Sequence, residues 1–170
     1  MNRVANCNLI KVGILTISDR GSQGLRQDQG GPRIRFLLPA ESYQVTEKAV
    51  VPDEIPAIMD QLVDWVDRKK LDLIFTTGGT GLSPRDITPE ATARVVERQI
   101  PGIAEAMRFE GLKHTPLSQL SRGIAGVRGE TLIINFPGGL KAIEEMMPVV
   151  LPVIPHALEK IKGDPRDCAR

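Results

Sequence analysis

Two aspartates that follow predicted strands are the residues of this sequence best suited to chemistry on a phosphate group. Asp86 lies in TTGGTGLSPRDITPEAT at 76–92, and Asp53 lies in VVPDE at 50–54. Strand-end carboxylates beside an anion-binding turn are what a Mg²⁺–phosphate complex requires. The alternative for Asp53 is that it simply caps the following helix. Asp19, after the first predicted strand, is a third candidate with the same alternative.

The glycine-rich turn before Asp86 is the predicted anion site. Glycines permit positive φ and close approach of the backbone, so that successive N–H groups can point at an anion. A helix beginning at Thr88-Pro89 adds its positive dipole end, although Thr88 could equally be an N-cap. The turn matches neither a P-loop nor the dinucleotide fingerprint. If this segment is considered by itself, the alternative is that it is only a strand-to-helix turn and binds no ligand.

Three such turns are expected to meet at one edge of a sheet. SDRGSQG at 18–24, TTGGTGLSPRD at 76–86 and NFPGG at 135–139 each follow a predicted strand. The carboxyl ends of parallel strands are where ligands bind in α/β folds. Four arginines near the turns could neutralise phosphates, namely Arg20, Arg26, Arg85 and Arg122. The alternative is that they are simply solvated, as charged loop side chains more often are.

The hydrophobic pattern predicts the elements that position these turns. Strands are expected at 11–19, 43–51 and 71–77, with helices beginning at Pro32 and covering 55–66. Further along the chain, the pattern predicts helices at 89–99 and 103–112 and two strands within 122–136 that are joined through 126–130. It also predicts a helical tail at 140–162 that is interrupted at Pro148, Pro152 and Pro155. Alternating strands and helices predict an α/β fold with a mostly parallel sheet, which an antiparallel ribbon joins.

Composition excludes several classes of function. With 170 residues, no repeat and no linker, one domain is expected. A net charge of +1 argues against a nucleic-acid partner, and no apolar stretch is long enough to span a membrane. Cys7 and Cys168 lie near opposite ends, so neither a zinc site nor a disulfide framework is indicated. A reducing, cytoplasmic location fits best.

The motifs resemble those of a known family. The segments LDLIFTTGGTGLSPRDITPEAT, VVPDEI, TPLSQLSRGIAGVRGETLIINFPGG and LPVIPHALEKIKGD are similar to those of the molybdopterin adenylyltransferases, including the G domains of gephyrin and its plant counterpart. The resemblance extends from about Lys11 to Asp164. Molybdenum-insertion and competence-damage-inducible proteins share the central block, but the chain length and the tail favour the adenylyltransferase branch.

The resemblance implies a fold and an activity. It implies a three-layer α/β/α molybdopterin-binding domain, with a core at about 11–164 and short extensions at either end of residues 1–170. The implied assembly is a homotrimer. The implied reaction transfers AMP from Mg²⁺-ATP to the terminal phosphate of molybdopterin, releases pyrophosphate and allows hand-over to a molybdenum-insertion protein. The alternative is a non-catalytic protein that only binds molybdopterin or acts as a scaffold.

The resemblance also implies roles for individual residues. Asp53 and Asp86 match the two essential aspartates and are the implied Mg²⁺ ligands. The residues implied to bind nucleotide or pterin are Ser18, Asp19, Thr77, Gly78, Gly79, Thr80, Gly81, Ser121, Asn135, Pro137 and Gly138. One departure is Gly111, where the family commonly has a serine that contributes to the pterin site; Thr115 could supply a replacement donor.

Overall fold

A six-stranded sheet forms the centre of the computed structural model, which describes residues 9–166. The strand order is β2-β1-β3-β6-β5-β4; the first four are parallel, and β5 and β4 each run antiparallel to their neighbour. The strands are β1 (Ile10–Ile17), β2 (Tyr43–Val51), β3 (Leu73–Thr77), β4 (Arg98–Gln99), β5 (Ala125–Arg128) and β6 (Thr131–Phe136). Cys7 and Cys168 lie outside the described residues. The predicted parallel sheet with an antiparallel ribbon is confirmed.

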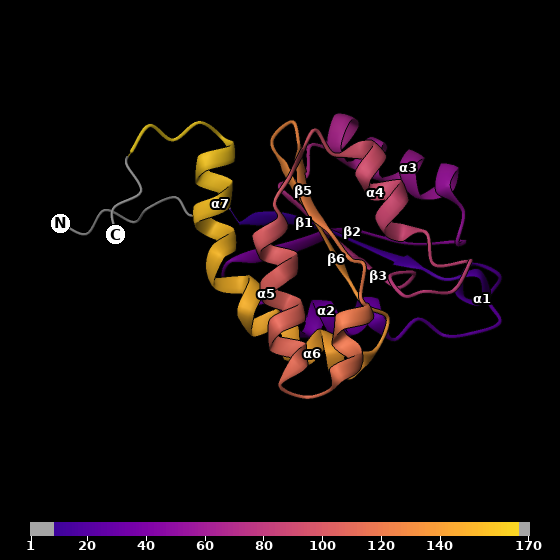
Figure 1. The fold of residues 1–170 in the computed structure, drawn as a ribbon. Coiled ribbons are helices and arrows are strands. Elements are labelled where there is room, and N and C mark those ends of the chain that lie inside the picture. The colour runs from indigo at the N-terminus through magenta and orange to yellow at the C-terminus, as the bar shows by residue number, and fades with distance from the viewer. Residues whose placement is uncertain (1–8, 167–170) are drawn as a thin grey trace.

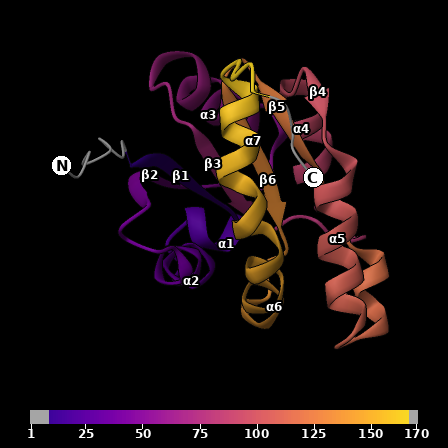
Figure 2. The same ribbon diagram turned by 90° about the vertical axis from the view of Figure 1, so that its left-hand side faces the viewer.

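Helices cover both faces of the sheet, so the fold has the three layers that the resemblance implied (Figures 1 and 2). One face carries α3 (Ile55–Val63), its π-helical continuation η1 (Asp64–Arg68) and α4 (Thr88–Val95). The other carries α2 (Gly30–Leu37), α5 (Pro101–Leu112), α6 (Leu140–Val150) and α7 (Ile154–Ile161). The short elements are α1 (Asp19–Ser22), η2 (Pro116–Leu120) and η3 (Leu151–Val153).

Strand β1 shows why the sheet is buried on both faces. Val12 and Ile14 pack into the core on the α2 side, and Leu15 and Ile17 pack into the core on the α3 side. Alternation along a strand requires this division, and it explains the continuous apolar run in the sequence. Gly13 leaves room for Trp65, because a Cβ at Gly13 would lie 2.6 Å from the indole Cε3.

The strand order brings three turns to one edge of the sheet. Strand β3 lies between β1 and β6, with Thr77 paired to both Thr16 and Phe136. The chain therefore leaves all three strands on the same side of the molecule, where Figure 1 places α1. This confirms the predicted convergence of the turns after β1, β3 and β6.

The helix predicted at 89–99 is wrong over its last four residues, 96–99. Helix α4 ends at Val95, and Arg98–Gln99 form the edge strand β4 beside β5. The flanking backbone joins this pairing, since the Glu97 and Ile100 N–H groups donate to the Val127 and Ala125 carbonyls at 2.8 Å. The exposed hydrogen-bonding edge of β5 and the following proline, which disfavours helical geometry at Ile100, together favour the strand.

Three smaller differences concern helix ends. Helix α2 begins at Gly30, two residues before Pro32, and the single turn α1 was not predicted. The predicted interruption at Pro148 is wrong: α6 continues through it to Val150. Pro148 lies in the last turn, where its missing N–H forfeits a single bond within the helix. Among the described residues, no helix combines the length and the apolarity that crossing a membrane demands.

Candidate functional site

The backbone at the ends of β1, β3 and β6 is in direct contact. The Gly78 N–H donates to the Phe136 carbonyl at 3.2 Å, and the Thr77 hydroxyl donates to the Pro137 carbonyl at 2.9 Å. A Cβ at Gly78 would lie 2.3 Å from the Ile17 carbonyl oxygen. These contacts hold the glycine turn after β3 between the turns after β1 and β6.

Two consecutive glycines in this turn have a left-handed conformation. Gly78 has φ 99° and Gly79 has φ 63°, which side-chain-bearing residues rarely adopt. A Cβ at Gly79 would also lie 2.4 Å from the Thr88 hydroxyl oxygen. That hydroxyl donates to the Gly78 carbonyl at 2.9 Å, so Thr88 fastens α4 to the turn. The alternative role of Thr88 as an N-cap is therefore wrong.

Asp53 binds the backbone of the turn after β1. Its Oδ2 accepts from the Asp19 N–H at 2.8 Å, and its own N–H donates to Asp19 Oδ1 at 3.0 Å. The alternative that Asp53 caps the next helix is wrong, because Glu54 is at that position and makes no side-chain cap bond. Burial raises the pKa of the Asp53 carboxyl above its ordinary value, and the charges of Asp19 and Asp86 add to this rise.

Asp86 is held by its own loop. Its Oδ2 accepts from the Ser83 N–H at 2.8 Å, and a Cβ at Gly81 would lie 2.8 Å from the same oxygen. In the described residues, Oδ1 of Asp86 and Oδ1 of Asp53 accept no hydrogen bond from the protein. Each aspartate therefore has one oxygen available to a ligand.

Asp19 and Arg85 form an ion pair that joins the loop around Asp86 to the end of β1. The Arg85 Nη2 lies 2.7 Å from Asp19 Oδ1, and its Nε donates to Oδ2 at 3.0 Å. The hydrogen bonds from Arg85 lower the pKa of the Asp19 carboxyl. Asp19 lies outside the cavities described below, so it acts on the site through Asp53 and Arg85.

Arg122 also has a structural role rather than the predicted phosphate contact. Its Nε donates to the Gly81 carbonyl at 2.7 Å, its Nη2 to the Asp86 carbonyl, and its Nη1 pairs with Glu90. The Arg122 N–H donates to the Thr80 carbonyl at 2.9 Å. Arg122 thus ties the chain after η2 to both ends of the loop that carries Asp86.

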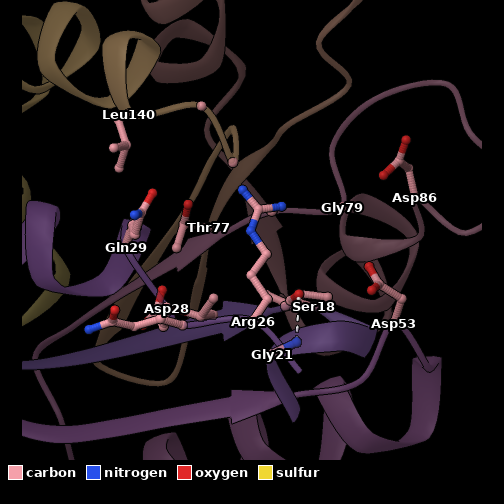
Figure 3. A pocket seen from close by; sticks show the side chains of 17 residues that line it. Ser18, Gly21, Arg26, Asp28, Gln29, Asp53, Thr77, Gly79, Asp86 and Leu140 are labelled. Atoms are coloured by element: carbon pink, nitrogen blue, oxygen red, sulfur yellow. Dashed lines mark hydrogen bonds between the residues drawn. The ribbon is translucent and has the colours of Figure 1, made fainter. Parts of the chain in front are cut away.

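A polar cavity of about 420 Å³ opens at the ends of the three strands (Figure 3). Asp53 and Asp86 lie together on one side of it, Asp28 and Gln29 lie on the other, and the Arg26 side chain extends between them. Among the described residues, the Arg26 guanidinium has no ion-pair partner. Of the four arginines proposed for phosphate, Arg26 is the one that lines this cavity.

A second cavity of about 460 Å³ adjoins the first and is more apolar. Leu117 and Leu120 of η2 and Ala142 and Met146 of α6 form its apolar wall. The two cavities share three residues, namely Gly79, Asp86 and Gly138. The glycine turn and Asp86 therefore lie at the junction of a polar and an apolar compartment.

The structure divides the predicted binding residues between these compartments. The first cavity is lined by Ser18, Asp53, Thr77 and Gly78, together with the three shared residues. The second is lined by Thr80, Gly81, Ser121 and Pro137, again with the shared residues. The Ser18 hydroxyl also accepts from the Gly21 N–H at 3.1 Å and caps α1.

Asn135 does not line either cavity, which corrects its predicted place in the pocket. It is 2% exposed, and its Nδ2 donates to the hydroxyls of Thr76 and Thr92 at 2.9 and 3.0 Å. Its Oδ1 accepts from the Ile124 N–H at 3.2 Å. Every polar atom of this side chain bonds within the protein, because it links β3, α4 and the start of β5.

Gly111 lies in the wall of the second cavity, beside a serine from another element. A Cβ at Gly111 would lie 2.2 Å from Ser118 Oγ and 2.9 Å from Ser118 Cβ. Ser118 donates from that position to the Arg108 carbonyl at 3.1 Å. The proposed replacement donor Thr115 also lines this cavity; its hydroxyl oxygen accepts from the Leu117 N–H, which leaves its O–H free to donate. Ser118 thus occupies the space that a side chain at position 111 would need.

Sequence reasoning missed several cavity residues, namely Thr16, Asp28, Gln29, Leu140, Glu145 and Met146. The sequence carried a local signal for Asp28. An aspartate just before a helix commonly accepts a hydrogen bond from a backbone N–H group of the first helical turn. Asp28 Oδ1 accepts from the Gly31 N–H at 3.1 Å and its Oδ2 from the Thr16 hydroxyl at 3.0 Å. Glu145 and Met146 had no such signal, because α6 reaches the site only through tertiary packing.

Comparisons with known proteins all point to one family. The profile of a family described as a probable molybdopterin binding domain matches residues 13–156. Gephyrin of Dictyostelium discoideum is 46% identical over 91% of this chain and 23% of its own length. A molybdopterin adenylyltransferase of Helicobacter pylori is 42% identical over 91% of this chain and 89% of its own. The crystal structure of the molybdopterin biosynthesis enzyme MoaB of Thermus thermophilus is 52% identical, with TM-score 0.86, covering 94% of this chain and all of that one. This chain therefore spans under a quarter of gephyrin but most of the bacterial relatives.

Proposed function

The chain belongs to the molybdopterin-binding domain family, and on this premise we propose that it is a molybdopterin adenylyltransferase. An oxygen of the terminal phosphate of molybdopterin attacks the α-phosphorus of ATP. The new O–P bond forms as the bond from the α-phosphorus to the bridging oxygen breaks, and pyrophosphate leaves with that oxygen. The product is a phosphoanhydride that joins AMP to molybdopterin.

The observation that carries the proposal is the junction of the two cavities. A reaction between two phosphates needs two binding compartments that meet at the reacting groups. Gly79, Asp86 and Gly138 line both compartments. We place the nucleotide phosphates in the polar cavity and the pterin in the apolar one, because pterin rings need apolar walls and a triphosphate does not.

The protein groups at the junction match the charge that the transfer develops. The N–H groups of Gly79, Thr80 and Gly81 and the Arg26 guanidinium neutralise phosphate oxygens. Asp53 and Asp86 each keep one carboxylate oxygen, and Mg²⁺ is commonly bound by one or two carboxylates together with substrate phosphates. No group of three or more metal-ligating side chains occurs among residues 9–166, so substrate oxygens would complete the shell. Bound there, Mg²⁺ would supply positive charge to the transferring phosphate.

We further propose that the chain acts as a single domain and a homotrimer in the cytoplasm, and that its product passes to a molybdenum-insertion protein. The Helicobacter pylori relative named as a molybdopterin adenylyltransferase is matched over 89% of its length, which supports the single-domain organisation of residues 1–170. The apolar side chains Phe109 and Leu112 of α5, 69% and 41% exposed, are surface that association between subunits would cover.

The test is the product of the reaction. Purified protein mixed with molybdopterin, ATP and Mg²⁺ is expected to release pyrophosphate and form an AMP–pterin adduct, detected by mass spectrometry. A molybdopterin adenylyltransferase known to be active serves as the control. Saturable molybdopterin binding without the adduct, under conditions in which the control forms it, would instead support the non-catalytic binding protein. Absence of binding to either substrate would refute both functions.

A further inference from the structure

The apolar cavity contains one carboxylate that the proposed transfer does not use. Glu145 lines this cavity but not the polar one, so it lies away from the junction where Asp86 is found. It belongs to α6, as does its neighbour Met146, whose buried side chain forms part of the apolar wall. A carboxylate beside apolar side chains costs free energy unless it accepts a hydrogen bond. Its position therefore indicates that a hydrogen-bond donor belongs beside it.

Glu145 has acceptor capacity to spare. Its side chain is 22% exposed, and its Oε1 lies 3.5 Å from His114 Nδ1. His114 also lies 3.8 Å from Glu110, so it is shared between two carboxylates. In the part of the chain that the structure describes, Oε2 of Glu145 has no hydrogen-bond partner. The carboxylate can therefore accept hydrogen bonds from a ligand in the cavity.

A pterin presents the donors that this carboxylate lacks. The aminopyrimidinone edge of a pterin has two adjacent N–H donors, at N3 and at the 2-amino group, and a carboxylate can accept both at once. Adenine does not match, because its N1 acceptor would face the carboxylate beside the N6 amine. The charge of Glu145 thus favours the pterin over the adenine of ATP in this cavity. Guanine shares the same edge and must be distinguished by experiment.

We propose, on the basis of the proposed function, that Glu145 is the residue that selects the pterin by binding its aminopyrimidinone edge. The ring faces contact Met146, Leu117 and Leu120, and the phosphate end lies toward Gly79 and Asp86. Methionine adapts to flat ring systems because its thioether is flexible and polarizable. Glu145 is a specificity residue and takes no part in the chemical step.

The first test compares ligands that differ at this edge. Binding of 6-hydroxymethylpterin phosphate, the corresponding lumazine phosphate and GMP is measured by calorimetry. Lumazine carries an oxo group in place of the 2-amino group, so it offers one donor fewer and an oxygen that the carboxylate repels. We expect the parent protein to prefer the pterin about tenfold or more, since sites built for hydrogen bonds reject analogues that lack the donor. Glu145→Gln should reduce this preference to about threefold or less, because its amide accepts at one atom only.

Glu144→Gln is the matched control. Glu144 is the preceding residue of α6, but it pairs with Arg33 at 2.8 Å and lines neither cavity. It should keep the parent's preference. Thermal unfolding followed by circular dichroism checks that both variants fold.

The second test uses the transfer reaction. Glu145→Gln should raise the KM for molybdopterin about tenfold or more, with kcat and the KM for ATP near the parent values. An unchanged molybdopterin KM, a pterin preference retained in Glu145→Gln, or equal binding of pterin and lumazine by the parent would each overturn the assignment while leaving adenylyl transfer intact. Binding of GMP more tightly than the pterin phosphate would also overturn it. If no transfer occurs, the proposed function fails and the ligand comparison still decides the role of Glu145.

Discussion

Asp86 has a position that no other carboxylate of residues 9–166 shares, because it lines both cavities. Asp53 lies beside it and lines only the polar cavity. Their carboxylates are oriented by backbone N–H groups of Ser83 and Asp19, which leaves little side-chain freedom to lose when substrate binds. Of the two, Asp86 is the better placed to act on both substrates.

Asp53→Asn and Asp86→Asn are each expected to lower kcat/KM for adenylyl transfer about 10²- to 10³-fold. An amide keeps the shape but removes the charge that, in the proposed mechanism, would hold Mg²⁺ and orient the transferring phosphate. Pyrophosphate release measures the rate, and Asp60→Asn, at an exposed position on α3, is the control. A double variant that works at the parent rate would remove both aspartates from the mechanism.

Gly111→Ser is expected to destabilise the fold by about 1–3 kcal/mol, because the new Cβ would overlap Ser118. The double variant Gly111→Ser with Ser118→Ala should recover most of that loss, since it moves the hydroxyl from η2 to α5. Urea unfolding of the parent, both single variants and the double variant gives the coupling energy directly. Additive losses would show that these two positions do not compete for the same space.

At the scale of elements, short polar contacts fix how the turns meet. The Thr77 hydroxyl binds the turn after β6, Thr88 binds the glycine turn, and Arg122 ties the loop of Asp86 to the chain after η2. The contacts of Thr77 and Arg122 join segments 60 and 41 residues apart, whereas the Thr88 contact spans only ten residues. The relative position of the two cavities therefore depends on the packing of α4 against α3 and the sheet and of η2 against α5.

Asn135→Ala is expected to lower the free energy of unfolding by about 1–3 kcal/mol, because buried hydroxyls of Thr76 and Thr92 and the Ile124 N–H lose their partner. The KM for ATP should stay near the parent value at temperatures where the variant is folded. Urea unfolding and steady-state kinetics measure the two effects. A raised KM with unchanged stability would return Asn135 to the binding site.

At the scale of the whole molecule, the sheet separates two apolar cores, and the site lies beyond the carboxyl ends of its strands. The exposed apolar residue Leu117 of η2 lines the second cavity, and the exposed Phe109 lies on α5, which packs against η2. Large exposed apolar side chains that lie close together are typical of interaction surfaces. Subunit association on this side would lie close to the pterin compartment.

Sedimentation equilibrium is expected to give three times the mass of the 18.6-kDa chain. Phe109→Ser should shift the equilibrium toward the monomer, because it removes apolar surface that the subunits would bury. Val153→Ser removes an exposed apolar side chain from η3 and serves as the control. A monomer mass for the parent at micromolar concentration would contradict the trimer.

The sequence by itself determined the fold class, the convergence of three turns and eleven of the residues that line the two cavities. Buried parallel strands have continuous apolar runs, and their carboxyl ends must meet at one edge, so Asp53, Asp86 and the glycine turn were predictable. Only the tertiary structure decided the rest. Asn135 follows the same pattern yet points into the core, α4 gives way to β4 because a neighbouring strand offers hydrogen bonds, and Glu145 reaches the site through helix packing. Local patterns record which residues are buried or turn-forming, whereas side-chain direction and partners depend on segments distant in the chain.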